Sequence, residues 1–148
     1  MKNKRNIKFI VIHCTATQPN AKLENIQKYW KEVKGWKDVP GYHYIIKTNG
    51  EVVKLLDENK NSYGVYAHNN ECISLSYIGG IDASGKAKDT RTRKQETAMF
   101  DKIVELTERY PEAKVVGHRD FAGVKKACPS FDVKTWLSNY TPDLDIAA

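Results

Sequence analysis

Two histidines and one cysteine are of residue types that bind metals, and their positions in the sequence are typical of a metal site. His118 follows the short apolar run 115–116, and Cys128 comes after a loop rich in Gly, Lys and Ala. His13 ends another apolar run, 7–12, in the same way. Imidazole and thiolate are ligands that zinc prefers, and three protein ligands with one open position are typical of catalytic zinc. If both runs are strands of one sheet, the sequence predicts one zinc ion per chain.

Each of these residues also has a structural interpretation. A histidine at a strand end is often only a hydrogen-bonded core residue, and a free cysteine is often a small buried thiol. Arg119 and Asp120 stand next to His118, where they would either support a metal ligand or form a surface ion pair. Because side chains alternate along a strand, Cys14 is expected to face the core, away from His13. Spacing alone leaves the choice between metal site and core open.

The composition indicates one globular domain. Of the 148 residues, 41% are hydrophobic and 28% are charged, so neither a disordered chain nor a membrane protein is favoured. The longest apolar run, 9–12, is far short of the roughly 20 residues that cross a bilayer. We therefore expect a single domain over residues 1–148, without a membrane span, that is a monomer.

Charge and cysteine content bear on partners and compartment. The net charge of +6 suggests an acidic partner, such as nucleic acid, a cell-wall polymer or a membrane surface, unless it serves solubility alone. Of these we expect the cell-wall polymer and no membrane partner, and nucleic acid is not favoured. Three cysteines give no disulfide framework, and a reduced Cys128 fits the cytoplasm. The basic segment 1–6 precedes an apolar run too short for a signal peptide. Synthesis and retention in the cytoplasm, until release, are therefore expected.

The pattern of apolar and polar residues predicts an α/β fold. The run 7–12 contains four consecutive apolar residues, which is typical of a buried central strand. Thr92 and Gln95 have capping-box spacing at the start of the longest helix, and an Asn-Gly pair between two apolar runs is a strong hairpin signal. The order of elements favours a central mixed sheet flanked by helices, with 115–116 parallel to its neighbour. The predicted strands are 7–12, 43–47, 51–56, 72–78 and 115–116, and the predicted helices are 21–34, 92–110 and a short one from Asp132 through Leu137.

Four segments occur in the order and at the spacing of one known family. They are IVIHCTAT (10–17), VPGYHYIIKTNGEV (39–52), YIGGID (77–82) and KACPSFD (126–132). With these segments in view, the chain from Phe9 to about Trp136 resembles the zinc N-acetylmuramoyl-L-alanine amidases of the phage lysozyme type. These enzymes share their fold with the peptidoglycan recognition proteins. Each segment alone is weak evidence, whereas four in order are specific.

The resemblance also implies which residues form the site. His13, His118 and Cys128 match the zinc ligands of the family, while Tyr42 and Lys126 match the positions that assist at the metal. Zinc with an open position lowers the pKa of a water molecule to about 7 and polarises the scissile carbonyl. Tyr42 would donate a hydrogen bond to that water or to the oxyanion, and Lys126 would bring a positive charge to the oxyanion. The structural alternatives are a packing aromatic for Tyr42 and a solvated charge for Lys126.

One segment departs from the family pattern. After Ala67 and His68, residues 69–71 lead almost directly into the next strand, where the family usually has a longer loop with Gly and Asn. His68 is therefore open to two interpretations, as a substrate-binding residue of the groove or as the cap of an exposed turn.

The implied activity is hydrolysis of the amide between the lactyl group of muramic acid and L-alanine in peptidoglycan. A phage or prophage endolysin of this kind would act on the cell wall after release. Two alternatives remain: a module that binds muropeptide without cutting it, and an amidase that also binds a cytoplasmic partner. Recognition proteins that have lost catalysis typically lack the cysteine ligand, so Cys128, together with Tyr42 and Lys126, favours the enzyme.

Overall fold

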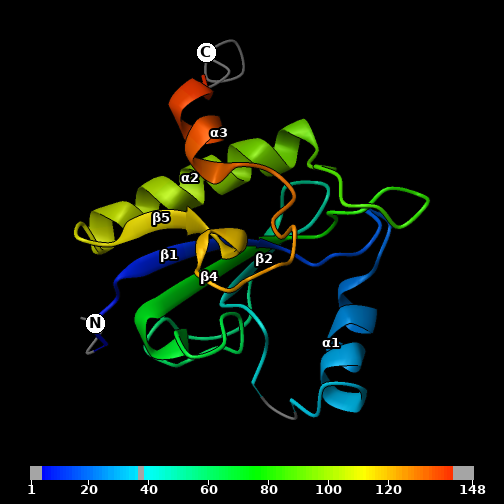
Figure 1. The fold of residues 1–148 in the computed structure, drawn as a ribbon, viewed down its shortest axis with the longest axis horizontal. Coiled ribbons are helices and arrows are strands. Elements are labelled where there is room, and N and C mark those ends of the chain that lie inside the picture. Colours follow the sequence, from blue (N-terminus) through cyan, green and yellow to red (C-terminus); the bar gives the residue numbers. More distant parts are fainter. Residues whose placement is uncertain (1–4, 37–38, 142–148) are drawn as a thin grey trace.

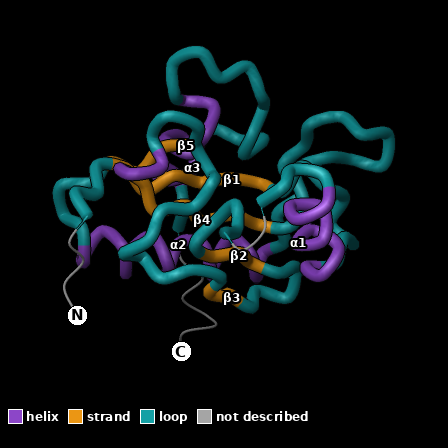
Figure 2. Tube along the Cα trace, turned by 90° about the horizontal axis from the view of Figure 1, so that it is seen from below, coloured by secondary structure: helices purple, strands orange, loops and turns teal. Residues whose placement is uncertain are grey.

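The computed structural model describes residues 5–36 and 39–141, so the predicted domain 1–148 extends beyond it at both ends. The strands are β1 (Phe9–Cys14), β2 (Tyr44–Ile46), β3 (Val52–Lys54), β4 (Cys72–Tyr77) and β5 (Lys114–Gly117), and the α-helices are α1 (Leu23–Glu32), α2 (Arg93–Arg109) and α3 (Val133–Asn139). The strands form one sheet in the order β3-β2-β4-β1-β5, as Figure 2 shows. Helices α2 and α3 pack on one face and α1 on the other (Figure 1). The predicted α/β fold, a mixed sheet flanked by helices, is confirmed.

Strand β1 brings two predicted metal ligands together. It pairs in parallel with β5, and the register places Ile12 opposite Gly117. His13 and His118 are the next residues of the two segments, so they lie side by side although they are far apart in the sequence. The predicted parallel pairing of the strand at 115–116 is therefore confirmed.

Strand β1 also extends two residues beyond the C-terminal end that the apolar pattern predicts. The apolar run 7–12 stops before His13, whereas the strand continues through Cys14. His13 and Cys14 pair with Ser76 and Tyr77 of β4, and this ladder carries the strand past its apolar residues. His13 therefore lies within a strand, with 1% of its surface exposed, rather than just after one.

Alternation along β1 and β4 gives the sheet two different faces. Ile12 and Cys14 pack into the core under α2, which confirms that Cys14 faces away from His13. On the opposite face, β4 carries the small hydroxyl side chains of Ser74 and Ser76, both fully buried. His13 shares this second face, so the ligand lies over a polar part of the sheet.

The buried side chain of Gln95 connects the start of α2 to the sheet by hydrogen bonds. Thr92 and Gln95 form the predicted capping box, in which each side chain accepts a hydrogen bond from the other residue's backbone N–H. In addition, Nε2 of Gln95 donates to the carbonyls of Ile46 and Ile78, at 3.1 and 3.2 Å. Gln95 is fully buried, so water does not compete for these bonds. Hydrogen bonds as well as apolar packing therefore hold α2 on the sheet.

We expect Gln95→Ala to lower the free energy of unfolding by about 2 to 4 kcal/mol. The variant loses half of the capping box and removes the side-chain donor from two buried carbonyls, of which the Ile46 carbonyl still accepts from the Ile78 N–H. Thermal unfolding should show a melting temperature lower by roughly 5 to 15 °C. Glu108→Ala, at an exposed position of the same helix, is the control. Equal stability of the two variants would contradict this role of Gln95.

Helix α1 and the hairpin of β2 and β3 build the side of the molecule that faces the metal ligands. Ile26 and Trp30 are the buried residues of α1 and pack on β2, and the Trp30 ring contacts the Tyr42 ring edge-on at 5.5 Å.

The helix is shorter than the predicted range 21–34, because the backbone of Lys22 is still extended. The predicted hairpin is confirmed. Among the described residues, no helix has the length and apolar character needed to cross a membrane.

Candidate metal centre and groove

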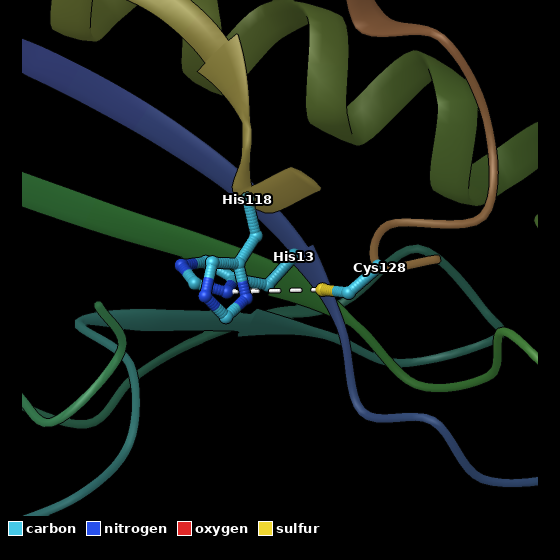
Figure 3. Close-up of side chains that lie close together, drawn as sticks. All are labelled: His13, His118 and Cys128. Carbon is cyan, nitrogen blue, oxygen red and sulfur yellow. Dashed lines mark hydrogen bonds between the residues drawn. The ribbon is translucent and has the colours of Figure 1, made fainter. Parts of the chain in front are cut away.

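The three predicted metal ligands lie together where β1 and β5 end. His13, His118 and Cys128 each offer one donor atom, and these atoms all lie within 4.8 Å of one another. Figure 3 shows the two imidazole rings close together with the Cys128 sulfur facing them. Nδ1 of His13 is 3.9 Å from Sγ of Cys128, and the two ring centroids are 4.8 Å apart. The side chains are therefore close enough to bind one metal ion.

Backbone hydrogen bonds connect the segments that carry His118 and Cys128. The N–H of Arg119 donates to the Cys128 carbonyl at 2.9 Å, so the loop is tied to the residue that follows His118. The Asp120 carboxylate accepts from the Gly117 N–H at 2.7 Å and closes the short 3-10 helix that begins at His118. Asp120 thus supports the ligand segment through the backbone, which is one of the two roles that the sequence left open.

Burial keeps both imidazoles neutral at pH 7. Desolvation, with His118 nearby, holds the pKa of His13 well below its ordinary value of 6.5. Desolvation also lowers the pKa of His118, and the positive charge of Lys126 adds to the effect. Because a neutral imidazole is the form that binds a metal, no proton has to leave either ring at neutral pH before an ion binds.

The sulfur of Cys128 completes a donor set that fits zinc. The backbone N–H of Cys14 donates to Sγ of Cys128 at 3.3 Å. A hydrogen bond with the Cys14 thiol, together with burial, raises the pKa of the Cys128 thiol, so this thiol is protonated in the absence of a metal. Metal binding would displace that proton. Two neutral imidazoles and one thiolate are the ligand types that zinc prefers.

A groove of about 970 Å³ opens beside the ligands and extends along α1. Tyr42 and Lys126, the predicted catalytic residues, both line it. The Tyr42 ring is 5.0 Å from the His13 ring, and its hydroxyl donates to the Cys14 carbonyl at 3.1 Å. Burial raises the pKa of Tyr42, so the hydroxyl remains a hydrogen-bond donor. Lys126 is exposed on the loop, and its positive charge lowers the pKa of His118.

Aromatic side chains form the wall of the groove on the side of α1. Trp36 and Tyr63 stack with their ring centroids 5.1 Å apart and their planes at 21°. Tyr29 and Tyr66 also line the groove; Tyr29 is about half exposed and Tyr66 is almost fully exposed. Sequence reasoning missed these residues, because they come from α1 and from separate loops that share no periodic pattern. Exposed aromatic rings in a groove are typical of a surface that binds a ligand.

His68 lies apart from the groove. Its ring packs against the Phe121 ring at a centroid distance of 4.9 Å, and its Nδ1 is 3.3 Å from a carboxylate oxygen of Glu71. It precedes a short 3-10 helix, Asn69–Glu71, which forms the shortened segment before β4. His68 is not among the residues that line the groove, so the structure does not bring it to the metal ligands.

Comparison with known sequences places the chain in a family. Residues 3–131 match the family described as N-acetylmuramoyl-L-alanine amidase. The endolysin of Escherichia phage T7 is 36% identical over 137 residues, which cover 91% of this chain and 88% of that protein. The endolysin of Enterobacteria phage T3 is 38% identical over 129 residues, covering 86% of this chain and 83% of that protein.

Solved structures share the fold. The Ph2119 endolysin from a Thermus scotoductus bacteriophage superimposes with a TM-score of 0.75 at 25% identity, covering 93% of this chain and 85% of that one. The N-acetylmuramoyl-L-alanine amidase LysC from Clostridium intestinale gives a TM-score of 0.73 at 22% identity, over 90% of this chain and 87% of that one. With the family match over residues 3–131 and endolysins above 30% identity along most of the sequence, this chain belongs to the N-acetylmuramoyl-L-alanine amidase family.

Proposed function

We propose that this chain hydrolyses the amide between N-acetylmuramic acid and L-alanine in peptidoglycan, with one zinc ion as its cofactor. The observation that carries the proposal is the meeting of His13, His118 and Cys128 at the groove, within a sequence of an amidase family. The endolysins among its relatives favour the cell wall as the place of action, after release from the cytoplasm. We further propose that the chain acts as a monomer on muropeptide or on the intact wall.

The residues of the site divide the work of catalysis. His13, His118 and Cys128 would hold zinc, which when bound supplies a Lewis acid for the scissile carbonyl and activates a water molecule for attack. The protonated Tyr42 hydroxyl would exchange its bond to the Cys14 carbonyl for one to the scissile carbonyl oxygen as that oxygen gains negative charge. The Lys126 ammonium, on the loop before Cys128, stabilises the same charge.

The groove suits a muropeptide in its chemistry. Its α1 side offers aromatic rings, such as the Trp36 and Tyr63 pair, and the loop before Cys128 offers the positive charge of Lys125. Peptidoglycan carries sugar rings with apolar faces and stem peptides with carboxylates. Aromatic rings favour the apolar faces of the sugars, and a lysine favours the carboxylates of the stem peptide. The two sides of the groove would therefore bind different parts of the substrate.

Zymography on purified cell wall, with and without a chelator, tests the proposal. We expect a cleared zone that disappears with chelator and returns when zinc is added back. A protein that binds cell wall without clearing it, whether or not chelator is present, would instead be a non-catalytic peptidoglycan-binding module. That result would refute the proposed hydrolysis.

We expect kcat/KM to fall as the pH decreases into the acid range and to stay nearly constant over a wide range of basic pH. The pKa values of His13 and His118 lie below 6.5, so these rings are neutral above that pH and gain protons, at the expense of metal binding, as the pH falls below it. On the basic side, the raised pKa of Tyr42 keeps its hydroxyl protonated. A pH profile of kcat/KM measures both limbs. A narrow bell centred well below pH 6 would contradict this assignment and indicate a carboxylate base.

A further inference from the structure

The two ring nitrogens of His13 face different partners. Nδ1 lies on the side of the metal ligands, 3.9 Å from Sγ of Cys128. Nε2 lies 3.2 Å from Oγ of Ser74, on the neighbouring strand β4. Both side chains are at most 1% exposed. A neutral imidazole carries a single proton, so the partner at Nε2 decides whether Nδ1 has a free lone pair.

The Ser74 backbone is itself held by a second histidine. The Ser74 N–H donates to Nδ1 of His43 at 3.0 Å, and the Ser74 carbonyl accepts from the His43 N–H at 2.9 Å. Because Nδ1 of His43 accepts, its proton is on Nε2, which lies 2.7 Å from the Lys60 carbonyl and donates to it. His43 thus fixes the backbone of Ser74, from which the hydroxyl side chain projects.

Gly64 leaves the space that the Ser74 hydroxyl occupies. A Cβ atom at residue 64 would lie 2.5 Å from Oγ of Ser74, 2.9 Å from the Gly41 carbonyl oxygen and 3.1 Å from Nε2 of His13. Any side chain there would therefore push the hydroxyl away from the ring. Strand β4, the segment around residue 64 and the ring of His13 meet at this one hydroxyl.

We propose that Ser74 is a positioning residue for the metal ligand His13. Its Oγ accepts the Nε2–H of the neutral ring, which fixes the tautomer with an unprotonated Nδ1 and orients that nitrogen toward Cys128. The reverse bond, with the hydroxyl donating to Nε2, would put the proton on Nδ1 and block metal binding. Partners of this kind at the second nitrogen typically change metal affinity by about 10- to 100-fold. The inference rests on the proposed metal site.

The tautomer is measured directly by ¹⁵N NMR of the histidine rings in the metal-free wild-type protein at neutral pH. A His13→Asn variant identifies the His13 signals by their loss. The expected result is a proton on Nε2 and an unprotonated Nδ1. A proton on Nδ1 would overturn the proposal. This measurement needs neither activity nor a Ser74 variant, so it decides the question even if the variant below is unstable.

Zinc affinity of Ser74→Ala, measured by competition with a chromophoric chelator, supplies the second test. We expect a zinc Kd weaker by about 10- to 100-fold in a folded protein, as checked by thermal unfolding. Ser76→Ala is the matched control, since Ser76 is equally buried on the same strand face, but its hydroxyl donates to the Tyr77 carbonyl. Its Kd should stay close to the wild-type value.

The outcomes separate this inference from the proposed function. Equal zinc affinities of wild type and Ser74→Ala would overturn the role of Ser74 and leave the zinc amidase intact. A wild-type protein that binds no zinc would instead refute the metal site itself.

Discussion

Cys128→Ala is expected to lose most of its zinc and, with it, nearly all hydrolysis of cell wall. The change removes one of three donors and leaves His13 and His118 as a two-ligand site, which holds a metal weakly. The loss of affinity should exceed the about 10- to 100-fold that the loss of an outer hydrogen-bond partner costs. Metal analysis of the purified variant, beside wild type, measures the zinc content per chain.

Cys72→Ala is the matched control for this variant. Cys72 is 1% exposed and packs with Val11 and Val65, in a cluster that does not contain the metal ligands. Its replacement should lower stability through lost packing while zinc content stays at one per chain. A full complement of zinc in Cys128→Ala would remove Cys128 from the metal site.

Lys126→Met is expected to lower kcat and kcat/KM alike, by about 10²- to 10³-fold, the typical effect of losing one donor to an oxyanion. The charge that the ammonium stabilises develops only as the amide is attacked, so ground-state binding should change little. Methionine keeps most of the side-chain stem and its packing. The variant should therefore fold, retain zinc and bind muropeptide with similar affinity. Steady-state kinetics on a soluble muropeptide, with zinc analysis of the same sample, measures the effect.

Lys125→Met tests whether the effect on turnover is specific to Lys126 or is shared by the neighbouring lysine of the same loop. Lys125 is exposed beside Lys126 and lines the same groove, but it is one residue farther from Cys128. We expect this variant to keep most of its turnover. Near-wild-type turnover of Lys126→Met would make Lys126 a solvated surface charge, and loss of zinc with activity would mean that it only positions the loop of Cys128.

Local patterns were sufficient to predict most of the fold. The capping box of Thr92 and Gln95 and the hairpin both appear in the structure, because each depends on residues close in sequence. The strand at 115–116 was predicted to be parallel because it follows a helix, although its partner β1 is far away in the sequence. The end of β1 was predicted two residues short, because its last two residues are held by pairing with β4 rather than by their own apolar character. Pairing between distant strands leaves little trace in a single sequence.

Some residues of the candidate site were likewise predictable from the sequence, and others were not. His13, His118 and Cys128 were candidates because imidazole and thiolate are ligand types that zinc prefers and because they match the zinc ligands of the family. The register of β1 and β5 brings the two histidines together. The contact of Ser74 with His13 was not predictable, since serine is common on strands and the bond depends on the register of β4. The stacked rings of the groove wall come from separate loops, and His68, a candidate from sequence, lies beside Phe121 instead.

Mass spectrometry of digested sacculi tests the central claim most directly. Hydrolysis of the proposed amide leaves stem peptides that begin with a free L-alanine amino group, and glycan strands whose muramic acid carries a free lactyl carboxylate. We expect both products from the zinc-loaded wild-type protein and neither from Cys128→Ala. Reducing sugar ends, which mark a cut between sugars, or stem peptides cut after L-alanine, would contradict the account.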